Sequence, residues 1–140
     1  MSTDEADLYT DEHNAEELRK AGANGTLGSW IRAHLSRSNG GDYVALLAYI
    51  ARDPGTIGSL QKMRLAVRDK RRVATCAEFG PRFLHSTGQA YKGGPDSGVF
   101  LQITGEPQQD LEIPGRPFTF GGFIAAQAIG DGSVLTDHRR

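Results

Sequence analysis

A chain of 140 residues with a formal net charge of −1 is long enough for one domain with a hydrophobic core. Its content of 38% hydrophobic and 24% charged residues lies in the range of water-soluble globular proteins. The near-neutral charge, without a basic face interleaved with aromatic residues, argues against a nucleic-acid partner. A basic run at residues 68–72 (RDKRR) is most simply the solvated end of a helix, where cations suit the helix dipole.

Targeting and metal-binding signals are missing from the sequence. No apolar run approaches the roughly 20 residues needed to cross a bilayer, so we expect no membrane partner. The acidic start, MSTDEADLY, lacks the regions of a signal peptide, and the single cysteine, Cys76, excludes an internal disulfide. The histidines and carboxylates have no metal-ligand spacing, so no metal or organic cofactor is expected. These features predict a cytoplasmic protein.

The division of the chain follows its composition. Residues 1–7 are polar and are expected to be disordered. Residues 8–130 are expected to form a single domain. Residues 131–140 (DGSVLTDHRR) are polar and are expected to be a flexible tail.

Two short helices are predicted before the first strand. Asn14 and Glu17 have the spacing of a capping box, which predicts a helix that starts there and ends near Gly22. Thr26 is a candidate N-cap for the second helix. Apolar residues recur on one face of this helix, at Leu27, Trp30, Ile31 and Leu35. His34 lies beside that face, and packing is the simpler role for it.

Three strands are predicted, at residues 42–50 (DYVALLAYI), 72–79 (RVATCAEF) and 97–104 (SGVFLQIT). The first is continuously apolar, as in parallel sheets covered on both faces. A helix with Thr56 as its N-cap and the basic run at its end separates the first two strands. The order β-α-β-α-β predicts an α/β fold, a three-layer sandwich with a short parallel sheet. Cys76 falls within the second strand and is expected to be a core residue.

The candidate site lies between the second and third strands. If residues 81–92 form one helix, its polar side chains make a continuous stripe with Ser86 at the edge: Arg82, His85, Gln89 and Lys92. This helix would start at the carboxyl end of a strand, where open parallel sheets bind ligands. Its N-terminus together with Arg82 would suit a phosphate. On spacing alone, however, a solvated helix face is the favoured interpretation.

The chemistry of the stripe suits a sugar phosphate. His85 could exchange protons with a hydroxyl or a ring oxygen near neutral pH. Gln89 could orient a sugar hydroxyl, and Lys92 could reach an anion or a hydroxyl. No serine nucleophile elbow, P-loop or dinucleotide glycine motif is present.

The segment FGPRFLHSTGQAYKGGPDSGVFLQIT resembles a characteristic segment near the C-terminus of bacterial bifunctional transaldolase/glucose-6-phosphate isomerases. YTDEHNAEELRKAG, GDYVALLAYI and IPGRPFTFGGFIAAQAIGDG resemble further pieces of the isomerase half. The resemblance runs from about residue 8 to about residue 130. More distantly, the pattern His-Ser-x-x-Gln…Gly resembles that of conventional phosphoglucose isomerases.

The resemblance implies a phosphoglucose isomerase terminal lobe with a sugar-isomerase-like (SIS-like) fold. It implies that the chain is the terminal domain of an enzyme that interconverts glucose 6-phosphate and fructose 6-phosphate, a step of glycolysis and gluconeogenesis, and that the isolated chain is weakly active or inactive. It also implies that His85 is the acid/base of ring opening, with Gln89 and Arg82 near the substrate. Lys92 and Ser86 are further candidates for substrate binding, for which the resemblance settles no role.

The chain departs from the conventional isomerases where their proton-moving glutamate would stand, since the sequence there reads ARDPG. Their late catalytic lysine also falls beyond the end of the chain. The site is therefore expected to be completed by an SIS or transaldolase partner or by a second copy of the chain. The alternatives are a non-catalytic module for sugar-phosphate binding or subunit assembly, and a degenerate gene fragment.

Overall fold

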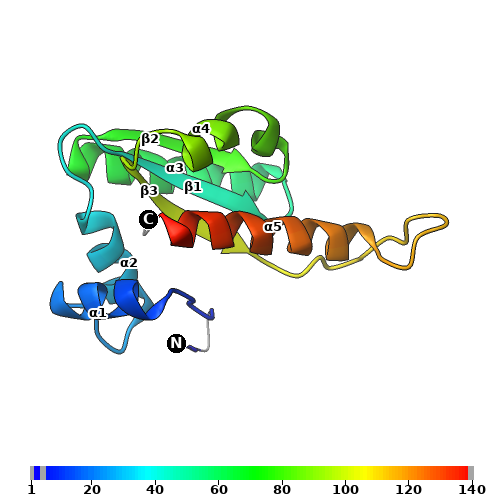
Figure 1. Cartoon of the computed structure of the whole chain (residues 1–140), viewed down its shortest axis with the longest axis horizontal. Coiled ribbons are helices and arrows are strands. Elements are labelled where there is room, and N and C mark those ends of the chain that lie inside the picture. The colour runs from blue at the N-terminus through cyan, green and yellow to red at the C-terminus, as the bar shows by residue number, and fades with distance from the viewer. Residues whose placement is uncertain (1, 4–5, 139–140) are drawn as a thin grey trace.

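The computed structural model describes the whole chain except residues 1, 4–5 and 139–140. The described residues form five α-helices, one 3₁₀-helix and three strands (Figure 1). In chain order they are α1 (Glu12–Lys20), α2 (Leu27–Ser36), β1 (Tyr43–Tyr49), α3 (Pro54–Arg71), β2 (Ala74–Phe79), η1 (Arg82–His85), α4 (Thr87–Gly93), β3 (Gly98–Thr104) and α5 (Phe120–Asp137).

The three strands form one parallel sheet in the order β2-β1-β3. Ala45 in the central strand lies opposite Cys76 on one side and Phe100 on the other. Every residue of β1 after Tyr43 is buried, which explains its continuously apolar sequence. The predicted three-layer α/β sandwich with a short parallel sheet is confirmed.

Side chains alternate between the two faces of the sheet, and each face has its own apolar core. Leu47 and Tyr49 point to the face covered by η1, α4 and α5. Val44 and Leu46 point to the opposite face, where Leu60 of α3 packs. Figure 1 shows α3 behind the sheet and α4 and α5 in front of it. Within the described part of the chain, no helix is long and apolar enough to cross a bilayer.

The helix α1 packs on α2 to one side of the sheet, around Leu18 and Trp30 (Figure 1). The prediction that Asn14 caps α1 is wrong. The N-cap is Asp11, whose carboxylate accepts the backbone N–H of Asn14 at 2.9 Å. An Asp three residues earlier provides the same side-chain oxygen acceptor, so the true cap was present in the sequence.

Of the two other predicted caps, Thr26 is confirmed and Thr56 is wrong. Thr26 caps α2 as predicted, since its hydroxyl accepts the N–H of Ser29 at 3.3 Å. The cap of α3 is Asp53, which accepts from the backbone N–H of Thr56 at 2.9 Å. The helix therefore begins at Pro54 and not after Thr56, and proline is well suited to a first helical position.

The two ends of the chain also depart from the predictions. The flexible tail expected from residue 131 is helical through Asp137. Asp131 and Leu135 are 5% and 4% exposed, so this part of α5 is held by packing that its polar composition conceals. The disorder expected over residues 1–7 falls partly on residues 1, 4 and 5, which lie outside the described residues. Ser2 and Asp7 form an isolated β-bridge.

The His34 side chain on α2 covers the open edge of β3. Its Nε2 lies 2.7 Å from the carbonyl oxygen of Phe100, and a carbonyl can only accept, so Nε2 carries a proton. Burial lowers the pKa of His34 below its usual 6.5, and the bond to Phe100 opposes this. The neutral ring is therefore the form that the fold favours.

The pH dependence of stability is expected to follow from this histidine. The pKa of His34 is lower in the folded protein than in the unfolded chain. The neutral ring therefore contributes to the free energy of unfolding fully above pH 6.5, and this contribution is lost as the pH falls through the folded-state pKa. Denaturation by urea at pH 7 and pH 5 measures it, with His34→Gln as the variant and the exposed His13→Gln as the control. A His34→Gln variant that keeps the full loss of stability between pH 7 and pH 5 would contradict this assignment.

Candidate functional site

The segment after β2 turns sharply and is not one helix. The Gly80–Pro81 peptide bond is cis, η1 follows, and Ser86 then leaves the helical region with φ −133° and ψ −105°. The helix α4 starts only at Thr87. The predicted continuous helix over residues 81–92 is therefore wrong.

Burial of Phe83 accounts for the break. Its ring is 3% exposed and packs edge-on against Tyr49, at a centroid distance of 5.7 Å. Gly88 in the first turn of α4 lies directly over Phe83, because a Cβ there would come within 2.9 Å of the Phe83 carbonyl oxygen. The turn at Ser86 lets Phe83 enter the core while α4 covers it. Only glycine at position 88 allows the backbone of α4 to come this close to Phe83.

The break divides the predicted polar stripe into two sets. Arg82 and His85 on η1 are exposed. Within the described residues, neither side chain takes part in a hydrogen bond or an ion pair. The Ser86 hydroxyl is also exposed and lies 3.4 Å from the Phe83 carbonyl oxygen.

The other set, Gln89 and Lys92, has partners within the protein. The Gln89 amide turns back and donates to the Leu84 carbonyl at 2.7 Å. The Lys92 ammonium lies 2.8 Å from a carboxylate oxygen of Asp131 on α5, and its side chain is only 27% exposed. Arg82 and His85 thus remain available to a ligand at η1, whereas Gln89 and Lys92 have structural partners.

Asp131 is the centre of a buried polar cluster that sequence analysis missed. The Tyr49 hydroxyl donates to the second oxygen of its carboxylate at 3.2 Å. Burial raises the pKa of Tyr49, and the Asp131 charge raises it further. The cluster joins β1, α4 and α5. The signal available in the sequence was a lone carboxylate after an apolar segment, at a position where composition alone predicts a flexible tail.

A second polar cluster fixes α4 to the edge strand β2. The Tyr91 hydroxyl and the Thr87 hydroxyl donate to the two oxygens of Glu78, at 2.7 Å and 2.6 Å. The Cys76 sulfur lies 3.1 Å from the Tyr91 hydroxyl and is half-buried, and burial raises the pKa of its thiol. Cys76 therefore packs between sheet and helix as expected, and a raised pKa suppresses thiolate chemistry.

Arg52 and Arg82 lie just after the ends of the neighbouring strands β1 and β2. Arg52 follows β1 by three residues and Arg82 follows β2 by three residues. Parallel neighbours end at the same edge of a sheet, so both arginines belong to the carboxyl edge, where open α/β sheets bind ligands. The Arg52 guanidinium is 5.7 Å from the centre of the Phe79 ring. Arg52 was not predicted from the sequence, although it closely follows the first predicted strand.

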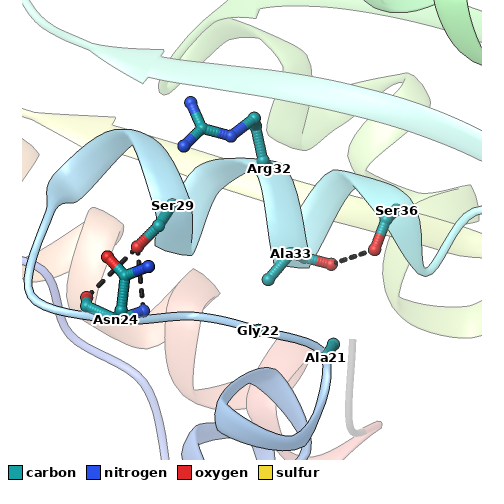
Figure 2. A pocket seen from close by; sticks show the side chains of 7 residues that line it. All are labelled: Ala21, Gly22, Asn24, Ser29, Arg32, Ala33 and Ser36. Carbon is teal, nitrogen blue, oxygen red and sulfur yellow. Dashed lines mark hydrogen bonds between the residues drawn. The ribbon is translucent and has the colours of Figure 1, made fainter.

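Other features of the surface offer weaker sites. One shallow depression is lined by Arg68, Asp69 and Arg72. Another is lined by residues of α2 and of the connection before it. Figure 2 shows the second, in which the polar groups bond to one another: the Asn24 N–H donates to the Ser29 hydroxyl at 2.9 Å and the Ser36 hydroxyl to the Ala33 carbonyl at 2.7 Å. Across the described residues, no three histidines, cysteines or carboxylates are grouped as metal ligands.

The comparisons with known proteins give a fold and no family. No protein-family model matches the chain, and no curated protein matches it. The chain is similar to the crystal structure of the hypothetical protein TT0462 from Thermus thermophilus, with a TM-score of 0.67 and 15% sequence identity. The match covers 91% of this chain and 36% of that one. At this identity the similarity concerns the fold alone, and the chain spans little more than a third of the solved protein.

Proposed function

We propose that the chain is the terminal lobe of a glucose-6-phosphate isomerase and carries part of its sugar-phosphate site. The observation that carries this proposal is the position of His85. It is exposed, without a partner among the described residues, one turn after Arg82 at the carboxyl edge of a parallel sheet. The resemblance of the surrounding segment to bifunctional transaldolase/glucose-6-phosphate isomerases supports the same function.

Each residue has a role in this proposal. Arg82 binds the phosphate or another anionic part of the substrate, for which a guanidinium is well suited. In ring opening, His85 gives a proton to the ring oxygen as the C1–O bond breaks, and the C1 hydroxyl gives its proton to water as the C1 carbonyl forms. The amide oxygen of Gln89 accepts from one sugar hydroxyl, and the hydroxyl of Ser86 accepts from or donates to another. Lys92 contributes through the N–H groups that Asp131 does not use.

Isomerisation also needs a base that moves a proton between C1 and C2, and we propose that a second lobe supplies it. The nearest carboxylate after β1 is Asp53, which is already the cap of α3. Hydrogen bonds from Thr56 lower the pKa of Asp53, which makes it a weak base. A partner polypeptide or a longer parent chain would then complete the site.

The assay that tests the proposal is the interconversion of fructose 6-phosphate and glucose 6-phosphate, by the chain alone and by the chain mixed with an SIS-type lobe. His85→Ala is expected to reduce turnover by about 10²–10⁴-fold, the usual contribution of a general acid/base. The control is His13→Ala, on an exposed face of α1, which should leave the rate unchanged. If the unaltered chain supports measurable turnover in the mixture and His85→Ala and His13→Ala keep the same rate, His85 has no catalytic role.

A subunit-assembly module is the second candidate function, and exposed apolar side chains favour it. They lie on α5 and the segment before it: Leu111, Phe118, Phe120, Phe123, Ile129 and Val134. Ile129 is 74% exposed, and the first turns of α5 extend beyond the sheet (Figure 1). A helix that is apolar on all sides is usually buried in the complete protein. An inactive mixture in which sedimentation still detects a complex with the SIS-type lobe would favour assembly alone.

A further inference from the structure

We infer that Asp131 is a positioning residue for the candidate site, one that sets the orientation of Arg82 and His85 through Lys92 and α4. This inference rests on the proposed function for the role of the site, but not for the structural coupling itself. Asp131 lies on a different helix and is buried, so it does not touch a ligand at η1. Its effect would pass from α5 to α4 and from α4 to η1, which carries Arg82 and His85.

The first contact is the ion pair between α5 and α4. The Asp131 side chain is 3% exposed, and its carboxylate lies 2.8 Å from the Lys92 ammonium. A buried carboxylate has to remain paired, because an isolated charge in the interior is strongly unfavourable. Lys92 is therefore constrained to stay at Asp131, and the last turn of α4 is constrained with it.

The second contact carries the constraint from α4 to η1. The helix α4 has seven residues, too few to hold its place without tertiary contacts. The Gln89 amide donates to the Leu84 carbonyl at 2.7 Å, and Gly88 lies against Phe83. A shift or rotation of α4 about the non-helical residue Ser86 would therefore move η1.

The side chains of Arg82 and His85 are those that a ligand at η1 would contact. Among the described residues, Arg82 and His85 have no hydrogen-bonding or ionic partner of their own. Their direction is thus set by the backbone of η1, which is the segment that α4 holds. The helix α4 is also anchored to β2, where the hydroxyls of Thr87 and Tyr91 donate to Glu78, and Lys92 is its anchor on the α5 side.

The test compares the side-chain NMR resonances of His85 and Arg82 in the full chain without ligand. Asp131→Asn keeps an acceptor for Tyr49 but removes the charge that holds Lys92, and it should displace both sets of resonances. Asp137→Asn, on the same helix but exposed, should leave them in place. A purely structural role would lower the melting temperature of Asp131→Asn and leave the resonances of the folded protein where they were, which would overturn the inference.

Two milder changes keep the test decisive if Asp131→Asn does not fold. Asp131→Glu preserves the charge but moves the carboxylate by one methylene, so the His85 resonances should shift. Lys92→Arg preserves the ion pair and should leave them close to their original positions. His85 resonances that stay fixed in Asp131→Glu would contradict the coupling.

Ligand binding then separates this inference from the proposed function. With fructose 6-phosphate as the probe, Asp131→Asn should weaken binding by about tenfold or more, the scale of one misplaced charge-assisted hydrogen bond. No binding by the unaltered chain would contradict the proposed function, while the ligand-free resonances would still decide the positioning role. Equal affinity of Asp131→Asn and the unaltered chain would overturn the inference.

Discussion

Lys92→Met is expected to lower the free energy of unfolding by about 3 kcal/mol, because it leaves the Asp131 carboxylate buried without its cation. This is the lower end of the range for a broken buried pair, since Lys92 is itself 27% exposed and water can partly replace it. Chemical denaturation measured at pH 7 gives the value directly. The Tyr49 hydroxyl would remain as the one polar neighbour of the carboxylate that the structure provides among the described residues.

The matched control is Lys20→Met on α1. Lys20 pairs with Glu17 at 2.7 Å, nearly the same distance, but both side chains are exposed, so no measurable loss is expected. The double variant Lys92→Met/Asp131→Asn should recover most of the stability, because the unpaired charge is then absent. If Lys92→Met costs no more than Lys20→Met, the carboxylate is not buried as described.

Leu47→Ala is expected to lower the free energy of unfolding by about 2–5 kcal/mol, the range for removing a large buried aliphatic side chain. Leu47 is 0% exposed in the central strand and packs in the core beneath η1, α4 and α5. Its loss leaves a cavity between the sheet and the helices that cover this face, and the close-packed neighbours can fill that cavity only in part.

The control for this variant is Ile129→Ala on α5. Ile129 is 74% exposed, so its truncation should change the stability by less than about 0.5 kcal/mol in either direction. Urea denaturation of both variants against the unaltered chain provides the comparison. Equal effects of Leu47→Ala and Ile129→Ala would show that the central strand is not the core of the fold.

The sheet was the part of the fold that could be predicted from sequence. The strands gave strong signals because they are short apolar runs bounded by turns, and their order with intervening helices leaves few arrangements. The predicted ranges 42–50, 72–79 and 97–104 each contain the observed strand. Local signals of this kind do not depend on distant contacts.

The corner at Ser86 could not be predicted, because its cause is not local. The residues from Arg82 to Lys92 have helical spacing, but the burial of Phe83 against Tyr49 requires the chain to turn. Neither residue signals this contact in sequence. The same holds for Asp131, whose partners lie 39 and 82 positions away at Lys92 and Tyr49, and whose polar surroundings predicted a tail.

The candidate site could be predicted in part. His85 and Arg82 are exposed on one short segment at the carboxyl edge, as a ligand site requires. Helical spacing predicts Gln89 and Lys92 on the same face, but the break in the helix turns both toward protein partners. Substrate binding by Ser86 stays a prediction. Arg52 can be assigned to the carboxyl edge of the sheet only from the observed register of β1 and β2.

The most direct test of the sugar-phosphate site is a titration of the ¹⁵N-labelled chain with fructose 6-phosphate, followed by backbone amide NMR. We expect saturable shifts that centre on residues 80–94, with Arg52 included, and none with unphosphorylated fructose. Inorganic phosphate should reproduce only the shifts near Arg82 and Arg52. An absence of shifts at residues 80–94, or shifts confined to the basic run at residues 68–72, would contradict the proposed site.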